Sequence, residues 1–170
     1  MTSRPGDPAS VSVLGGALRG HALRLARLLD ELERPSRRGR APGRPDPTAP
    51  ERALLARTAE ELDRVGAQLQ GFATTTVETA ARLRRLEQDC AAADLRVQGE
   101  HVVEPAGPSR TDPADRLRSR ACLQAHLSRV VTADAEALAD LQREVHASAA
   151  RLERLSERAR TGSAAEAPGW

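Results

Sequence analysis

The sequence contains no lysine, asparagine, isoleucine or tyrosine, so all 26 of its basic residues are arginines. The codons of these residues are rich in A and T, and their shortage is typical of a GC-rich bacterial genome. We therefore give the preference for arginine no functional weight. Only two aromatic residues occur, Phe72 and Trp170. This excludes the stacking surfaces that bind single-stranded nucleic acid and disfavours a sheet-rich core.

Cysteine is also scarce, and long apolar runs are absent. Cys90 and Cys122 are two isolated thiols, which do not form a zinc-binding pattern or a disulfide framework. No stretch approaches the roughly 18 apolar residues of a membrane span. Residues 1–10 hold no apolar run, so we expect no classical signal peptide. The sequence predicts a cytoplasmic protein, and the alternative is export by a route without a cleaved signal peptide.

The residues that carry chemistry are scattered. No two of the four histidines lie three or four residues apart, as paired metal ligands on a helix would: His21, His101, His126 and His146. Nothing near Cys90 suggests an activating base. No strand is predicted, so no glycine-rich phosphate loop can follow one. The sequence therefore predicts no catalytic, cofactor-binding or metal-binding residue, and a protein that is not an enzyme.

What is present is alanine, leucine and valine together with arginine and glutamate, a composition typical of long helices. After a flexible N-terminus over residues 1–10, the pattern predicts a first helix over 11–34. Asp7 and Pro8 form a plausible start signal for it, as a cap and a first helical residue. Its apolar seam has heptad spacing: Leu14, Leu18, His21, Leu25, Leu28 and Leu32. Gly15 and Gly16 are expected to weaken its first turns.

Residues 35–50 hold five prolines and four arginines, Arg37, Arg38, Arg40 and Arg44. Because proline lacks an amide donor and fixes φ, no helix is predicted through this segment. We interpret it as a disordered basic linker and a solvated spacer. The alternative is weak binding of nucleic acid or anionic lipid through its arginines, a partner class that the sequence does not favour.

Residues 51–160 predict a long antiparallel helical hairpin of coiled-coil type. Thr48 and Glu51 have the spacing of a capping box. A period of 3.5 residues then continues in two rows, one through Leu55, Leu62, Leu69, Thr76, Leu83, Cys90 and Val97, the other through Thr58, Val65, Phe72, Thr79, Leu86 and Ala93. Gly99 is expected to end this helix.

The second arm of the hairpin begins at a comparable signal. His101–Val103 in the loop before it can be briefly extended, and Asp112–Pro113 predicts the helix start. Its rows run through Leu117, Gln124, Val131, Leu138, Val145, Leu152 and Ala159, and through Arg120, Leu127, Asp134, Leu141, Ser148 and Leu155. Residues 161–170 are expected to be a flexible tail. The predicted fold class is thus all-α, a long antiparallel hairpin with a shorter N-terminal helix packed on it.

The polar residues that interrupt the apolar rows of the two arms predict the register of the hairpin. A hairpin that closes near residue 105 pairs positions whose numbers add up to about 210, which places Thr76 opposite Asp134 and Thr79 near Val131. A shared polar layer at this level would fix the alignment at some cost in stability. The same register brings Cys90 to the level of Arg120 to Cys122, but Cys122 faces outward, so a disulfide is not favoured.

Residues 62–73, LDRVGAQLQGFA, together with the amphipathic helix before them, resemble the actinobacterial ESX or WXG100-like helical hairpins. The resemblance covers residues 11–97. The Trp-x-Gly turn and the Tyr-based export signal of that family are absent, because the single tryptophan is Trp170 and there is no tyrosine. The resemblance implies a small helical protein linked to type VII secretion that acts as a dimer or with a partner, and it assigns no functional residue.

Three hypotheses for function remain open. The first is a non-enzymatic helical interaction protein, associated with type VII secretion, that binds a protein partner or a second copy through its helix seams. The second is a cytoplasmic coiled-coil scaffold unrelated to secretion. The third is an anion-binding module that uses the arginines of residues 35–50.

Overall fold

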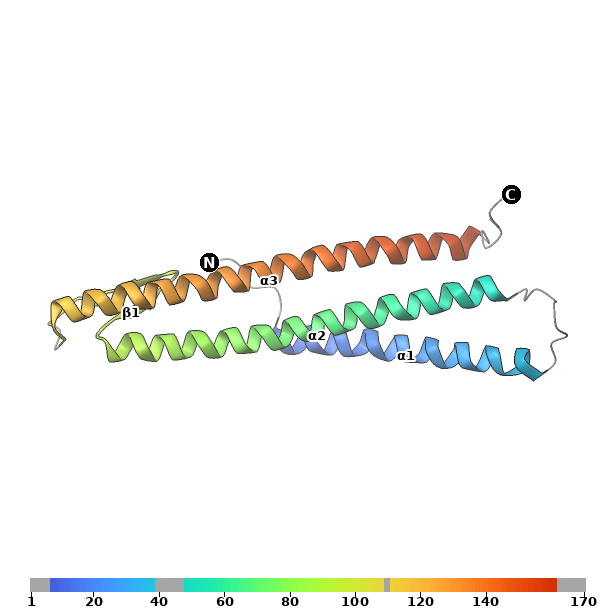
Figure 1. Cartoon of the computed structure of the whole chain (residues 1–170), viewed down its shortest axis with the longest axis horizontal. Coiled ribbons are helices and arrows are strands. Elements are labelled where there is room, and N and C mark those ends of the chain that lie inside the picture. Colours follow the sequence, from blue (N-terminus) through green and yellow to red (C-terminus); the bar gives the residue numbers. More distant parts are fainter. Residues whose placement is uncertain (1–6, 39–47, 109–110, 162–170) are drawn as a thin grey trace. The chain divides into compact units, whose positions relative to one another are not determined.

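The computed structural model describes residues 7–38, 48–108 and 111–161, and 86% of these residues are helical. The helices are α1 (Pro8–Arg38), α2 (Ala49–Ala92) and α3 (Pro113–Thr161), and two short strands, β1 (Arg96–Gln98) and β2 (His101–Val103), lie between α2 and α3 (Figure 1). The predicted helical class is therefore confirmed. No helix among the described residues has both the length and the apolar character that crossing a bilayer requires.

The chain divides into two compact units. The first comprises Met1–Pro8 and Phe72–Asp140, and the second comprises Ala9–Gly71 and Leu141–Trp170. The first unit thus holds the end of α2, both strands and the beginning of α3. The second holds almost all of α1, the beginning of α2 and the end of α3.

The three helix starts follow the capping signals in the sequence. The carboxylate of Asp112 accepts hydrogen bonds from the backbone N–H groups of Ala114 and Asp115, at 2.8 and 3.3 Å. These are two of the amides that the first turn of a helix leaves unpaired. Thr48 precedes α2, and its carbonyl accepts the N–H of Arg52 at 3.1 Å. Asp7 and Pro8 likewise stand at the cap and the first position of α1.

The boundary between the first helix and the linker was predicted wrongly. α1 does not end at residue 34 but continues through Pro35 to Arg38, so Arg37 and Arg38 are helical. Pro35 is the fourth residue from the helix end, where it removes one backbone hydrogen bond from a turn that is about to end in any case. Arg40 and Arg44 lie outside the described residues, as does the greater part of the predicted linker.

The end of α2 and the absence of strands were also predicted wrongly. α2 ends at Ala92 because Asp94, with φ of +54°, takes the left-handed position that glycine usually fills. The N–H of Leu95 bonds to the carbonyl of Cys90 at 2.8 Å, and the N–H of Asp94 to that of Ala91 at 3.2 Å. These two bonds form a Schellman motif, which turns the chain out of the helix.

Gly99 belongs to a β-hairpin and not to a helix end. β1 and β2 pair in antiparallel fashion with Gln98 opposite His101, which leaves a two-residue turn of Gly99 and Glu100. Gly99 has φ of +63°, the conformation that the first residue of a type II′ turn requires. The predicted extension of His101–Val103 is confirmed as β2.

The hairpin is bonded to α3 by two side chains. Gln124 accepts the N–H of Val102 at 2.7 Å and donates to the carbonyl of Glu100 at 2.9 Å. Arg120 donates to the carbonyl of Val102 at 3.1 Å. The core of the first unit includes Leu86, Cys90, Leu95, Val102 and Leu127.

Polar residues in the predicted rows behave differently from the expected shared layer. Thr76 and Thr79 are buried. The hydroxyl of Thr76, however, donates to the carbonyl of Phe72 in its own helix, at 3.0 Å. Within the part of the chain that the structure describes, no hydrogen bond joins Thr76 to Asp134. Threonine can satisfy its hydroxyl by bonding one turn back, so its burial does not require a partner on the other helix.

Candidate functional site

α1 and α2 meet at two glycines. A side-chain carbon added to Gly15 would lie 2.7 Å from the carbonyl oxygen of Gly66, and one added to Gly66 would lie 2.6 Å from that of Gly15. Both distances are shorter than a carbon can approach an oxygen, so the two backbones touch at this point. The sequence suggested only that Gly15 weakens its helix, because the partner glycine is 51 positions away and no local pattern connects the two.

Arg19 holds the helices together beside the glycines. Its Nε atom lies 3.0 Å from Oδ1 of Asp63, and its guanidinium also donates to Oε1 of Gln70 at 3.1 Å. Asp63 and Gln70 lie on either side of Gly66, two turns apart on α2. Because Arg19 follows Gly15 by one turn, these contacts fix the rotation of α1 about its own axis as well as its position.

This rotation covers one part of the predicted seam of α1 and exposes another. Six residues of α1 on the side toward α2 are partly or fully buried, namely Val11, Gly15, Leu18, Ala22, Leu25 and Leu29. Leu14, Leu28 and Leu32 remain 53%, 49% and 48% exposed, and His21 is exposed too. The predicted seam was therefore right for Leu18 and Leu25 and wrong for these four. We call Leu14, Leu28 and Leu32 the leucine face.

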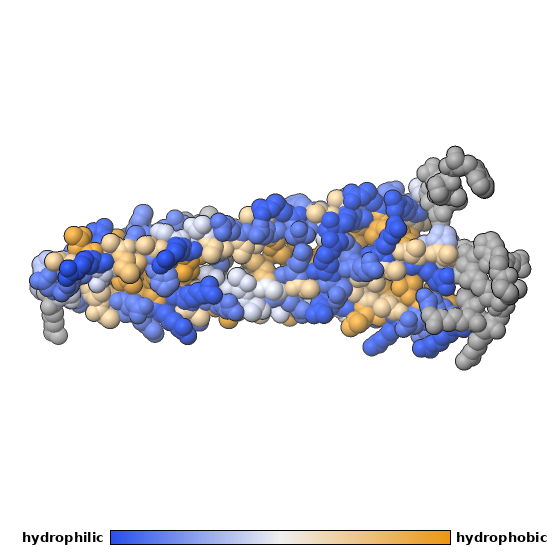
Figure 2. Space-filling view, in the orientation of Figure 1, coloured by the Kyte–Doolittle hydropathy of each residue, from blue (hydrophilic) through white to orange (hydrophobic). Residues whose placement is uncertain are grey.

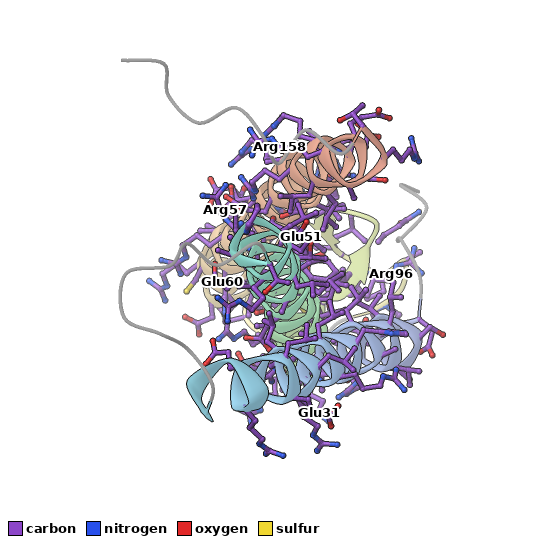
Figure 3. All side chains as sticks on the ribbon, turned by 90° about the vertical axis from the view of Figure 1, so that its right-hand side faces the viewer. Glu31, Glu51, Arg57, Glu60, Arg96 and Arg158 are labelled. Atoms are coloured by element: carbon purple, nitrogen blue, oxygen red, sulfur yellow. The ribbon has the colours of Figure 1, made fainter. Side chains whose placement is uncertain are left out.

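The leucine face lies along one side of α1. Its members are 14 and 4 residues apart, so at about 100° per residue they project in nearly the same direction. Leu23 is 61% exposed and projects roughly oppositely, nine residues from both Leu14 and Leu32. Figure 3 shows Glu31 on the side of α1 that faces away from α2. Apolar side chains reach the visible molecular surface in several places among charged ones (Figure 2).

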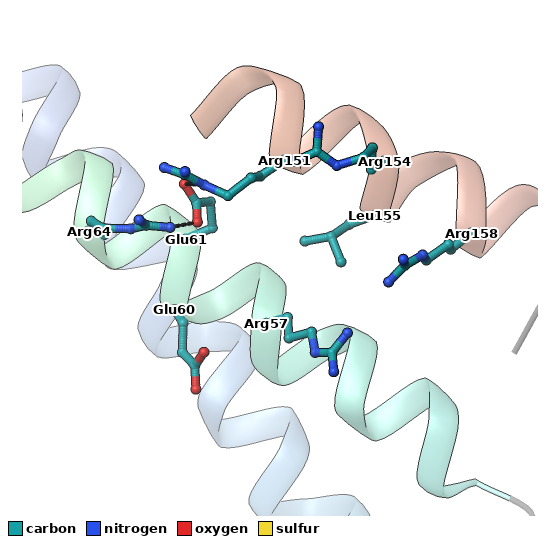
Figure 4. Close-up of a pocket in the computed structure, with 8 residues that line it drawn as sticks. All are labelled: Arg57, Glu60, Glu61, Arg64, Arg151, Arg154, Leu155 and Arg158. Atoms are coloured by element: carbon teal, nitrogen blue, oxygen red, sulfur yellow. Dashed lines mark hydrogen bonds and ion pairs between the residues drawn. The ribbon is translucent and has the colours of Figure 1, made fainter. Parts of the chain in front are cut away.

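A second feature of the same unit is a pocket between α2 and α3, which we call the arginine pocket. It has a volume of about 500 Å³ and is lined by Arg57, Glu60, Glu61, Arg64, Arg151, Arg154, Leu155 and Arg158 (Figure 4). Five of these eight residues are arginines and two are glutamates. No local pattern in the sequence predicts the pocket, because its arginines come from two segments about 90 residues apart.

Glu61 is the buried centre of one end of the arginine pocket. It is only 4% exposed, and its carboxylate pairs with Arg64 on its own helix and with Arg151 of α3, whose Nε atom is 2.9 Å away. Arg151 also donates to the hydroxyl of Ser148 at 3.0 Å, and Ser148 is itself buried. A buried carboxylate needs this degree of pairing, since an unpaired one would be strongly destabilising.

The other residues considered from the sequence do not come together. All four histidines are exposed, and His146 bonds to the carbonyl of Gln142 on its own helix. Among the described residues, no group of three or more histidine, cysteine or acidic side chains could hold a metal ion. Cys90 and Cys122 are both free thiols, Cys90 buried and Cys122 exposed. Burial, with Asp89 and Glu87 nearby, raises the pKa of Cys90, the opposite of what a nucleophilic thiol requires.

Comparison with protein-family models, with curated proteins and with solved structures found no match for this chain.

Proposed function

We propose that this protein is a non-enzymatic helical interaction protein that binds a second helix through the leucine face of α1. The observation that carries the proposal is the exposure of Leu14, Leu28 and Leu32 along one side of a helix whose adjoining side is already packed. Leu28 and Leu32 are one turn apart and form an exposed apolar pair, and Leu14 lies about 21 Å further along the same side of the helix. Their spacing is that of a seam in which side chains of two helices interlock.

We also propose that α2 and α3 form the antiparallel hairpin expected from the sequence. Two contacts within the second unit support it. Glu61 bonds to Arg151, and Gln68 bonds to Glu144 at 3.4 Å. A later residue of α2 thus meets an earlier residue of α3. The residue numbers of both pairs add up to 212, close to the 210 that the sequence predicts.

The class of partner follows from the resemblance of residues 62–73 to WXG100-like hairpins. On that basis, a helical component of a type VII secretion system is the first partner to test. The alternative is a second copy of this chain or another coiled-coil protein in a cytoplasmic scaffold. Both hypotheses use the leucine face, so the identity of the bound protein distinguishes them.

The experiment that tests the proposal is affinity capture with three forms of the chain. The wild type is compared with Leu28→Glu, which places a charge in the leucine face, and with Leu23→Glu, which places the same charge on the opposite side of α1. We expect an identified partner, or untagged chain, to be retained by the wild type and by Leu23→Glu and lost with Leu28→Glu. Equal retention by the two variants would contradict the proposal, as would the absence of any captured protein.

A further inference from the structure

Three arginines of the arginine pocket have no acidic partner. Glu61 is already paired with Arg64 and Arg151. Among the described residues, no carboxylate lies within ion-pair distance of Arg57, Arg154 or Arg158. Glu60, the other acid of the pocket, points away from α3 (Figure 4), whereas Arg57 of α2 and Arg158 of α3 both line the pocket. The pocket therefore holds an excess of three positive charges, five arginines against two glutamates.

The helix ends account for only part of this arrangement. Arg158 lies in the last turn of α3, where a cation is favoured by the negative end of the helix dipole. Arg57 lies about two turns into α2, beyond the range of that effect. Arg154 and Arg158 are one turn apart on α3, so their side chains project from the same face of the helix. Like charges at this spacing repel each other, and an anion between them would remove the repulsion.

Phosphate is the anion that suits this set of side chains. The planar guanidinium donates two parallel hydrogen bonds to phosphate oxygens, and a phosphate monoester carries about −1.5 to −2 charges near pH 7, which balances most of the excess. The volume of about 500 Å³ falls in the range of about 300–1,000 Å³ for small-molecule sites. It exceeds what one phosphate occupies, and Leu155 offers an apolar contact for the remainder of the ligand.

We propose that the arginine pocket binds the phosphate group of a phosphorylated ligand between Arg57 of α2 and Arg154 and Arg158 of α3. Leu155 contacts the part of the ligand next to the phosphate. Glu61, Arg64 and Arg151 position the two helices and do not contact the ligand. Phosphate of this kind is supplied by a soluble phosphorylated compound or by a lipid headgroup, and the chemistry of recognition is the same for both.

The test is isothermal titration calorimetry, in which the full chain is titrated with inorganic pyrophosphate at constant ionic strength. Arg57→Gln and Arg158→Gln each remove one guanidinium, and we expect each to weaken binding by about tenfold. Neither side chain has an ion pair or hydrogen bond with another described residue, so we expect the fold to be retained, which far-ultraviolet circular dichroism verifies. Arg129→Gln, which removes an exposed arginine of α3 outside the pocket, is the matched control and leaves the affinity unchanged.

A second arm distinguishes the two sources of phosphate. Flotation with phosphatidylcholine vesicles, with and without phosphatidic acid, is compared for the wild type and Arg57→Gln. Recruitment by phosphatidic acid that Arg57→Gln abolishes supports a lipid headgroup, and pyrophosphate binding without recruitment supports a soluble ligand. Absence of binding in both arms overturns the proposal, and so does equal weakening by Arg129→Gln, which would indicate only general attraction between charges.

Discussion

Gly15 and Gly66 set how closely α1 can approach α2. Each lacks the side-chain carbon that would collide with the carbonyl of the other, and the contact brings Arg19 to Asp63 and Gln70. A glycine inside a helix usually costs about 1 kcal/mol relative to alanine. Here the cost is offset by close packing between helices, a long-range effect that spacing along the sequence does not reveal.

Gly15→Ala is therefore expected to destabilise the protein, although alanine is the better helix former. The added carbon meets backbone that cannot move aside, and overpacking of this kind costs about 1–3 kcal/mol. Gly20→Ala is the control in the same helix, because nothing lies within 4 Å of its added carbon. It should stabilise the protein by about 0.5–1 kcal/mol. Urea unfolding followed by circular dichroism measures both, and a stabilising Gly15→Ala would refute the close contact.

The two cysteines are expected to differ in reactivity. Cys122 is exposed and should react rapidly with a thiol reagent, whereas Cys90 is fully buried and its pKa is raised. One fast thiol per native chain is the expected count, and Cys122→Ser should abolish it. Because the pKa of Cys90 is raised in the folded state, its neutral thiol contributes in full to the free energy of unfolding below about pH 8.5, the pKa of an unfolded thiol. This contribution is lost as the pH rises above that value. Two fast thiols in the native protein would contradict this burial.

At the scale of elements, helix starts were more predictable than helix ends. Asp112 and Pro113 form a local signal whose hydrogen bonds lie within three residues. The end of α2 was missed because Asp94 takes the position where glycine is the usual residue. The glycine that the sequence offered, Gly99, serves the turn of the β-hairpin. That hairpin has only three residues in each strand and depends on α3 for its remaining hydrogen bonds.

Replacing Gln124 tests whether the β-hairpin depends on hydrogen bonds from α3. Gln124→Leu leaves the N–H of Val102 buried without a partner, and we expect a loss of about 1–3 kcal/mol in the free energy of unfolding. Gln142→Leu replaces an exposed glutamine of the same helix and should change that free energy by less than about 0.5 kcal/mol. Chemical denaturation compares the two variants. Equal effects would show that Gln124 does not hold the hairpin.

At the scale of the whole molecule, composition and a 3.5-residue period were sufficient to predict a helical protein and most of its buried rows. Leu69, Leu86 and Leu127 are buried where the period places them. The period could not show which part of the α1 seam is covered, because that depends on the contact between Gly15 and Gly66. Nor could it show the arginine pocket, whose residues meet only after α2 and α3 have packed together.

We propose above that the leucine face of α1 binds another helix. Sedimentation equilibrium of the purified chain, alone and with the captured partner, tests it most directly. We expect the wild type and Leu23→Glu to sediment with more than the mass of one chain in at least one of these samples. Leu28→Glu is expected to sediment as a single chain in both. Indistinguishable masses for Leu28→Glu and Leu23→Glu would contradict it.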